Sequence, residues 1–143
     1  MGDMVTTTAA QDTDLASALV QTMHLLQDLH AETSRPLGLT SQQARLLCVL
    51  IAGPQGMTDL SHILSIERSS LTSMVDRLER RSLVARAPIP GDRRAFRIEL
   101  TPDGLELAHQ VHDAVVDRIN TLTAALPAGT RATVTAALQS ILP

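Results

Sequence analysis

One β-hairpin signal, in a chain that otherwise looks helical, is the feature that most constrains the fold. Residues 84–89 and 95–100 have the composition of strands, and the second segment alternates apolar and charged side chains. Residues 90–92, Pro-Gly-Asp, are typical of a tight turn between them. Thr101 and Pro102 follow at once and supply the N-cap and the first-turn proline of a helix. The chain is therefore expected to pass from a hairpin directly into a helix.

The segments on either side of the hairpin have helical periodicity. Thr40 and Gln43 match a capping box, and a Gly-Pro pair at residues 53–54 ends the helix that this box begins. A tight break near Ser65 separates the next two helices. We expect helices over about residues 14–34, 40–52, 59–64, 66–81 and 102–126, and a last helix that ends near residue 142. The third and fourth helices with the hairpin predict a winged helix-turn-helix lobe over about residues 40–100.

The fold class predicted is therefore mainly α with a small β-hairpin wing, in a single domain of residues 1–143. At 143 residues and 44% hydrophobic content the chain can bury one core. The helices at about 14–34 and 102–142 are apolar on more surface than one such chain can easily cover. We expect these terminal helices to pair with a second subunit and form a homodimer.

The charges of the chain are unevenly distributed. The net charge is −3, but residues 68–97 hold eight of the twelve Arg residues and only three acidic residues, a local balance of +5. The remainder holds four Arg and twelve acidic residues, a balance of −8. A basic segment in an acidic chain favours a site for an anion such as DNA and disfavours indiscriminate binding to nucleic acid.

The helix at about residues 66–81 has two different faces. Leu71, Val75 and Leu78 repeat at the spacing of a buried face, with Met74 beside them. The other face carries small hydroxyl residues followed by charged ones: Ser69, Ser70, Thr72, Ser73, Asp76 and Arg77. Short hydroxyl side chains let a helix approach DNA closely and bond to base edges or phosphates. A solvated face is the alternative.

Several classes of protein are excluded or disfavoured. The longest apolar run, residues 46–52, is far shorter than the roughly 20 residues that cross a bilayer. The N-terminus lacks the basic and apolar regions of a secretory signal, so we expect a cytoplasmic protein without a membrane partner. There is no Gly-rich phosphate loop and no nucleophile motif. We therefore predict no enzymatic activity and no cofactor.

These segments resemble the MarR family of bacterial transcriptional regulators. The resemblance spans about residues 15–126 and rests on "LTSQQARLLCVL" and on the run from "MVDRLE" through "LVAR" and "DRR" to "ELTPDG". It implies an intertwined dimer in which each subunit presents a recognition helix and a wing to a palindromic operator. It also implies a left-handed backbone at Ser82, where many members have Gly.

The resemblance also implies the DNA-binding residues. The recognition helix falls on Arg68 to Arg81, and its major-groove candidates are Ser69, Ser70, Thr72 and Ser73. Arg77 matches the Arg of the family's "DRL". The wing falls on Asp92, Arg93 and Arg94. In the family's Asp-x-Arg pattern the Arg enters the minor groove and the Asp holds it in position.

The signal that the regulator detects is harder to predict. Cys48 is a candidate for redox sensing, and His109 with His112 for zinc, but a core cysteine and an exposed His pair are the simpler interpretations. The chain has no Tyr or Trp, so aromatic ligand contacts known in some members cannot be carried over. We expect a ligand pocket where the dimerisation helices meet the DNA-binding lobe, and its residues stay unknown from sequence.

The function expected is a homodimeric repressor that a small-molecule ligand releases from a palindromic operator in double-stranded DNA. One alternative is a redox- or zinc-responsive regulator of the same fold. The other is a winged-helix protein-interaction module that does not bind DNA. The +5 balance of residues 68–97 favours DNA, because an interface with protein alone has little need of it.

Overall fold

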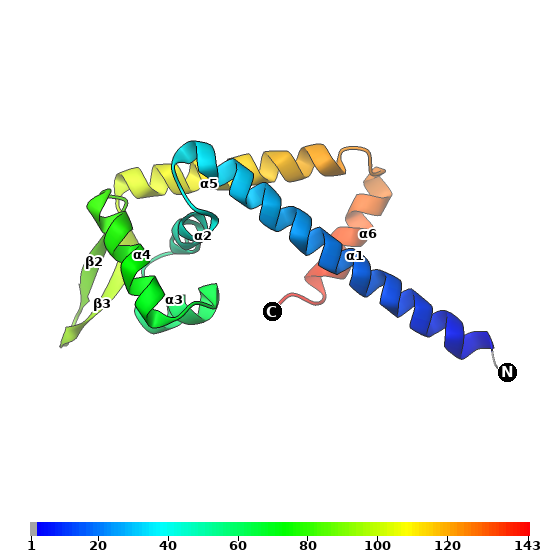
Figure 1. The fold of residues 1–143 in the computed structure, drawn as a ribbon, viewed down its shortest axis with the longest axis horizontal. Helices are drawn as coiled ribbons and strands as arrows, with labels where there is room; N and C mark the ends of the chain where they lie inside the picture. The colour runs from blue at the N-terminus through cyan, green and yellow to red at the C-terminus, as the bar shows by residue number, and fades with distance from the viewer. Residues whose placement is uncertain (1–2) are drawn as a thin grey trace.

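The computed structural model describes the backbone of residues 3–143 and the side chains from residue 14 onward. A lobe of short helices and strands lies at one end, two long helices extend away from it, and a shorter helix follows at their far end (Figure 1). The helices are α1 (Asp3–Ser34), α2 (Ser41–Leu50), α3 (Met57–Leu64), α4 (Arg68–Arg80), α5 (Pro102–Thr123) and α6 (Ala128–Gln139), with a short 3₁₀ helix, η1 (Arg35–Leu37). The strands are β1 (Gln55–Gly56), β2 (Val84–Ile89) and β3 (Asp92–Leu100). The predicted mainly α fold with a hairpin wing is confirmed.

The connection from α1 to α2 forms as the sequence predicts. Gly38 takes a left-handed conformation with φ of 72° and ends η1. The side chain of Thr40 then accepts a hydrogen bond from the backbone N–H of Gln43 at 3.1 Å. In return, the backbone N–H of Thr40 donates to the Gln43 side chain at 3.0 Å, so the capping box is complete. The chain therefore reverses within a few residues and brings α2 under the end of α1.

Some helix boundaries differ from the predicted ones. The first helix begins at Asp3 rather than near residue 14, and α2 ends at Leu50 rather than Ala52. The helix α3 begins at Met57 rather than residue 59, because Gly56 takes an extended conformation and serves as its N-cap. The helix expected to reach about residue 126 ends at Thr123, and Pro127 is the N-cap of α6, so Gly129 lies in the first turn of that helix.

The helix-turn-helix is formed by α3 and α4. Ser65 is left-handed, with φ of 53°, and provides the tight break between the two helices. Ser61 donates a hydrogen bond from its hydroxyl to the carbonyl of Ile66 at 2.6 Å, which fixes the turn. The apolar face of α4, Leu71, Val75 and Leu78, is fully buried against the core of the lobe. The opposite face of α4 is thereby directed outward.

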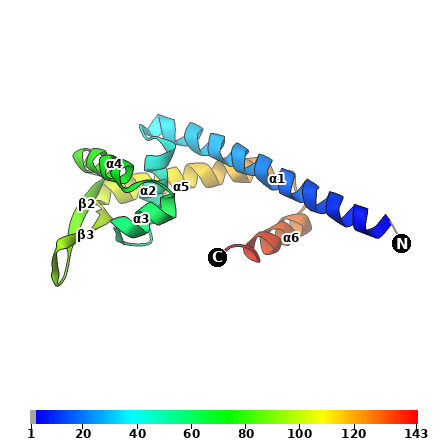
Figure 2. The same cartoon turned by 60° about the horizontal axis from the view of Figure 1, so that its bottom comes forward.

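The sheet has three strands in the order β1-β3-β2, all antiparallel. The strand β1, which no pattern in the sequence predicts, has two residues, and in it Gln55 pairs with Ile98 and Gly56 with Arg97. The second long strand begins at Asp92, which pairs with Ile89, so the turn is Pro90 and Gly91 alone. Figure 2 shows that the tip of the β2–β3 hairpin projects beyond the helices.

A tightly packed junction links the lobe to α5. Ser82 is left-handed, with φ of 59°, as the resemblance implied. The hydroxyl of Thr101 donates to the Ser82 carbonyl at 2.6 Å and accepts from the Gly104 backbone N–H at 3.0 Å. A Cβ on Gly104 would lie 1.8 Å from the carbonyl oxygen of Leu83. The first turn of α5 can therefore approach the end of the recognition helix only because residue 104 has no side chain.

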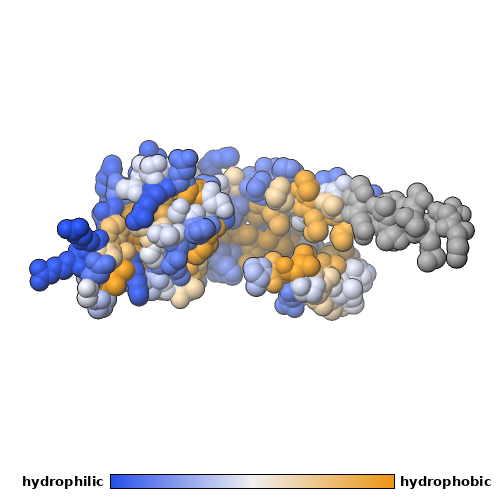
Figure 3. Space-filling view, turned by 90° about the horizontal axis from the view of Figure 1, so that it is seen from below, coloured by the Kyte–Doolittle hydropathy of each residue, from blue (hydrophilic) through white to orange (hydrophobic). Residues whose placement is uncertain are grey.

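The first and last helices leave apolar side chains in solvent. Every residue of α6 is exposed, and so is every residue of α1 from 14 to 28. In Figure 3 hydrophobic residues cover much of the surface where these helices face each other. The large exposed apolar side chains on α1 and α6 are Leu15, Leu19, Val20, Met23, Leu25, Leu26, Val134 and Leu138. None of the helices that the structure describes has the length and apolar character needed to cross a membrane.

Candidate nucleic-acid interface

The outward face of α4 carries the predicted major-groove residues. Ser69, Ser70, Thr72, Ser73 and Arg77 are exposed on this side of the helix, and Arg68 is exposed at the start of the helix. The Thr72 hydroxyl donates to the carbonyl of Arg68 at 2.8 Å, so its hydrogen is used within the helix and its oxygen can still accept a bond from a partner. The small size of the four hydroxyl residues leaves the helix backbone accessible to a flat or grooved partner.

Arg68 links the two helices of the motif. Its Nη1 lies 3.5 Å from the hydroxyl of Thr58 at the start of α3. Because the guanidinium has five donors, this one long contact leaves most of its hydrogen-bonding capacity for a partner. Arg68 therefore lies between the starts of α3 and α4, and its charge stays exposed.

The wing presents its basic residues at the hairpin tip. Gly91 is left-handed, with φ of 86°, and turns the chain there. Asp92, Arg93 and Arg94 follow, and all three are exposed. The carboxylate of Asp92 accepts a hydrogen bond from the backbone N–H of Arg94 at 3.1 Å. This bond fixes the backbone that carries the Arg94 side chain.

The two basic regions lie at one end of the molecule. Figure 3 shows strongly hydrophilic residues gathered at the wing end, with the apolar surface farther along the long helices. This agrees with the charge balance of +5 for residues 68–97. The arrangement offers an extended cationic surface, with small side chains on a helix and Arg side chains on a projecting hairpin.

One residue of the recognition helix is held by the wing rather than directed freely outward. Asp76 is paired with Arg86 of β2, and Glu79 lies 3.6 Å from the same guanidinium. Sequence analysis put Asp76 on the outward face with Arg77, but the pairing turns its carboxylate toward the wing. Only the packing of α4 beside β2 creates this contact, so helical periodicity alone could not predict it.

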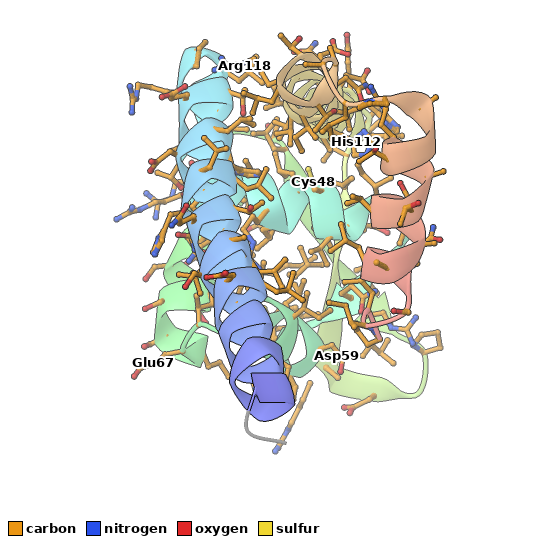
Figure 4. The ribbon with its side chains drawn as sticks, turned by 90° about the vertical axis from the view of Figure 1, so that its right-hand side faces the viewer. Cys48, Asp59, Glu67, His112 and Arg118 are labelled. Atoms are coloured by element: carbon orange, nitrogen blue, oxygen red, sulfur yellow. The ribbon has the colours of Figure 1, made fainter. Side chains whose placement is uncertain are left out.

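The candidate redox residue, Cys48, is a packing residue in this structure. It lies on α2, where Figure 4 labels it, and it packs against the buried core of the lobe. The thiol is half-buried, and its Sγ lies 3.9 Å from the carbonyl oxygen of Ala108 on α5. Burial raises the pKa of the Cys48 thiol, which disfavours the reactive thiolate.

The candidate zinc residues, His109 and His112, lie exposed on α5. His112 is near Asp113, with 3.5 Å between Nδ1 and Oδ1. Among the side chains that the structure describes, no group of three His, Cys, Asp or Glu residues could hold a metal ion. The fold does not bring His24 or His30 of α1 into such a group with them.

A polar cavity of about 300 Å³ lies between α1 and α2, where the terminal helices meet the lobe. Its lining is Gln27, His30, Ser41, Gln42 and Arg45. Two buried atoms of this lining, His30 Nδ1 and Gln42 Oε1, have no hydrogen-bond partner among the described residues. Burial, and then the neighbouring Arg45, hold the pKa of His30 below its ordinary value. The sequence could not reveal this cavity, because it depends on how α1 crosses α2.

Comparison with known proteins agrees with this architecture. The profile of the MarR family matches residues 39–96. The multiple antibiotic resistance protein MarR of Salmonella typhimurium is 36% identical over 110 residues, which are 76% of each chain. A mutant MarR from E. coli has a solved structure with a TM-score of 0.80 and 31% identity, over 90% of this chain and 96% of that one.

Two further solved structures contain bound molecules. A mutant E. coli MarR complexed with operator DNA has a TM-score of 0.72 and 30% identity, over 93% of this chain and 96% of that one. NadR in complex with 4-hydroxyphenylacetate has a TM-score of 0.73 and 25% identity, over 89% and 91%. Fold, motifs and sequence identity over most of the length lead to one conclusion: this chain belongs to the MarR family and is a winged helix-turn-helix, DNA-binding transcriptional regulator.

Proposed function

We propose that this regulator is a homodimeric repressor that binds a palindromic operator and leaves it when a small molecule binds. The observation that carries the proposal is the cationic end of the molecule, where the outward face of α4 and the wing tip lie together on an otherwise acidic chain. Because bacterial operators lie on chromosomal DNA, the expected place of action is the cytoplasm.

The outward-facing residues divide into two kinds of contact. Ser69, Ser70, Thr72 and Ser73 on α4 are small enough for the helix to enter the major groove, where their oxygens reach base edges. Arg68, Arg77 and Arg93 suit phosphates, because their charge is accessible to a partner. Arg94 suits the minor groove, where a narrow A·T-rich segment concentrates negative potential.

A second copy of the chain is the proposed cover for the exposed apolar surface of α1 and α6. An isolated helix as short as α6 is marginal in water, and α6 buries no residue within its own chain. A two-fold dimer would present two recognition helices, and the half-sites that they read would be related by the same symmetry. This is the reason for expecting a palindrome.

The cavity between α1 and α2 is the proposed effector site. Its volume is at the lower limit of ordinary ligand pockets, and Arg45 supplies a positive charge beside two unsatisfied polar atoms. The related NadR was solved with 4-hydroxyphenylacetate, a small hydroxylated carboxylate. A ligand of this class would offer a carboxylate to Arg45 and a hydroxyl to the amide oxygen of Gln42. Binding there would favour one arrangement of α1 relative to the lobe.

The test is selection of bound duplexes from a random-sequence pool, followed by titration of the selected duplex with salt and with 4-hydroxyphenylacetate. The proposal predicts a palindrome with half-sites about one helical turn apart, bound by two chains with a steep salt dependence. A non-palindromic consensus bound by one chain would contradict the dimeric arrangement. Unchanged affinity in 4-hydroxyphenylacetate, while benzoate and other small carboxylates also fail, would contradict the effector site.

A further inference from the structure

Arg86 lies at the centre of a contact between the recognition helix and the wing. It belongs to β2 and pairs in register with Ile98 of β3. Its guanidinium contacts the carboxylate of Asp76 through Nη2, and its Nε lies 3.6 Å from Glu79 Oε2. Both acids belong to α4 and are three residues apart, so they lie on one side of that helix. A single side chain of the wing therefore bridges two points on the recognition helix.

The flat face of the same guanidinium is also occupied. Its Cζ lies 5.1 Å from the centroid of the Phe96 ring, within the range of a cation–π contact. Phe96 belongs to β3 and pairs with Pro88, two positions along the hairpin from Arg86, so the two side chains are diagonal neighbours. Arg86 thus joins three elements, α4, β2 and β3.

These contacts leave Arg86 poorly suited to hold DNA itself. Two of its three nitrogens face carboxylates, and a phosphate would have to compete with both acids for them. Its side chain is about one-third exposed, whereas Arg93 and Arg94 at the tip are exposed and lie nearer to a partner. Its effect on DNA binding must then come from the elements that it joins.

The contact of Arg86 with Phe96 supports the outer part of the hairpin, where other packing is incomplete. The third strand, β1, pairs only with Arg97 and Ile98, and Ile98 is also the residue opposite Arg86, so the backbone support ends one residue beyond the level of Arg86. Beyond them a cavity of about 190 Å³ separates residues such as Ile89 and Ala95 from the start of α3. A two-stranded ribbon supported only at its base can twist and swing. We infer that Arg86 is a positioning residue that braces the wing against α4, and so fixes the separation at which the protein reads the major groove and the adjacent minor groove.

This inference rests on the proposed function, in which α4 and the wing contact DNA. A double-mutant cycle, measured on the selected operator, tests the positioning role of Arg86 separately from those contacts. The variants are Arg86→Gln, Arg94→Ala and the double variant, each measured on the operator and on a duplex with G·C in the minor-groove flanks. If Arg86 positions the wing, Arg86→Gln weakens operator binding and reduces discrimination between the two duplexes. In the Arg94→Ala background, Arg86→Gln should lower the affinity for the operator much less. The two losses of affinity should differ by about tenfold, which is the coupling between the residues.

Two controls separate positioning from charge and from folding. Arg80→Gln removes a neighbouring exposed charge of α4, and its effect should add to that of Arg94→Ala without coupling. Arg86→Lys keeps the charge but removes the planar fork and much of the stacking, so it should resemble Arg86→Gln in flank discrimination. Thermal unfolding of each variant identifies any decrease in binding that comes from unfolding.

The outcomes are distinct. One outcome is that the effects of Arg86→Gln and Arg94→Ala on affinity are additive and that Arg86→Gln weakens the salt dependence as the loss of one phosphate contact would. Arg86 would then bind DNA directly. This result would overturn the inference and leave the proposed function intact. Full rescue of flank discrimination by Arg86→Lys would also overturn it, because charge alone would then suffice. If Arg94→Ala has no effect in the wild-type background, the wing does not contribute, and the proposed reading of the minor groove fails together with the inference.

Discussion

The Oδ1 atom of Asp92 lies 3.1 Å from the backbone nitrogen of Arg94 and accepts its hydrogen bond. The acid therefore holds the main chain of the wing tip and leaves the Arg94 side chain to reach a partner. The Asp-x-Arg pattern presents Asp92 and Arg94 as a pair, but this geometry gives them different roles. It also predicts which of the two substitutions lowers the affinity for the operator more.

Arg94→Ala should weaken operator binding by about 1–3 kcal/mol, mainly because the preference for A·T-rich flanks disappears. Asp92→Ala should cost less, roughly 0.5–1.5 kcal/mol, because it removes one hydrogen bond that positions the tip. Fluorescence anisotropy with the operator and with a G·C-flanked duplex measures both. A larger effect of Asp92→Ala than of Arg94→Ala would show that the acid has another role.

Arg77→Ala should weaken binding to all duplexes by a similar factor. Arg77 lies on the outward face of α4 and is proposed to bind phosphate, and a phosphate carries no base identity. The slope of log affinity against log salt should decrease in magnitude by about 0.9 for each phosphate that the variant no longer binds. A change of base preference at one operator position, with an unchanged slope, would instead assign Arg77 to a base edge.

Gly104→Ala should destabilise the fold strongly. A Cβ at residue 104 would overlap the carbonyl oxygen of Leu83, at 1.8 Å, and this atom is backbone that cannot move aside as a flexible side chain can. We expect a decrease of about 3 kcal/mol or more in the free energy of unfolding by urea, at the upper end of overpacking effects. Gly129→Ala is the matched control, since nothing lies within 4 Å of its added Cβ, and it should be neutral or slightly stabilising. Equal stability of the two variants would contradict the close approach of α5 to the lobe.

The stability of the protein should fall in mild acid partly through His30. Its pKa is held below the ordinary value of about 6.5 by burial and by Arg45, so the folded state binds protons less readily than the unfolded state. This contribution is fully present above pH 6.5 and is lost as the pH falls through the lowered pKa. His30→Gln should therefore flatten the decline in stability below pH 6.5.

NMR titration of the His30 ring provides a direct check. Arg45→Gln removes one of the two causes and should raise the pKa of His30 toward its ordinary value. A pKa at or above 6.5 in the wild-type protein would show that the cavity is more polar than its described lining indicates.

Much of this fold could be predicted because its signals are local. The Thr40–Gln43 capping box and the Thr101 N-cap each act within a few residues, and each forms as expected. The turn forms where it was predicted, but it is shorter, because Asp92 already belongs to β3. The left-handed Ser82 was also predicted, because the resemblance placed it after the recognition helix. Periodicity identified the buried face of α4 for the same local reason.

What could not be predicted depends on distant residues. The strand β1 has two residues and forms only because β3 lies beside it. Asp76 on α4 and Arg86 on β2 form a pair, but the hydropathy of each residue predicts only that its side chain is exposed to solvent. The lining of the cavity between α1 and α2 comes from two helices whose crossing no pattern in either helix specifies. The residues of the proposed DNA contacts were accessible to sequence reasoning, but the brace that aligns them was not.

The exposure of α6 links the concentration of the protein to its resistance to proteolysis. The lobe has a buried core of its own, whereas all twelve residues of α6 are in contact with solvent in a single chain. A helix of that length needs neighbours to persist. In the proposed homodimer the second chain supplies these neighbours, so by mass action dilution would remove them. Newly made chains at low abundance would then carry frayed ends that proteases can cut, while abundant chains protect one another. The half-life of this regulator would rise with its concentration, which gives a cell a sharper threshold for repression than DNA affinity alone provides.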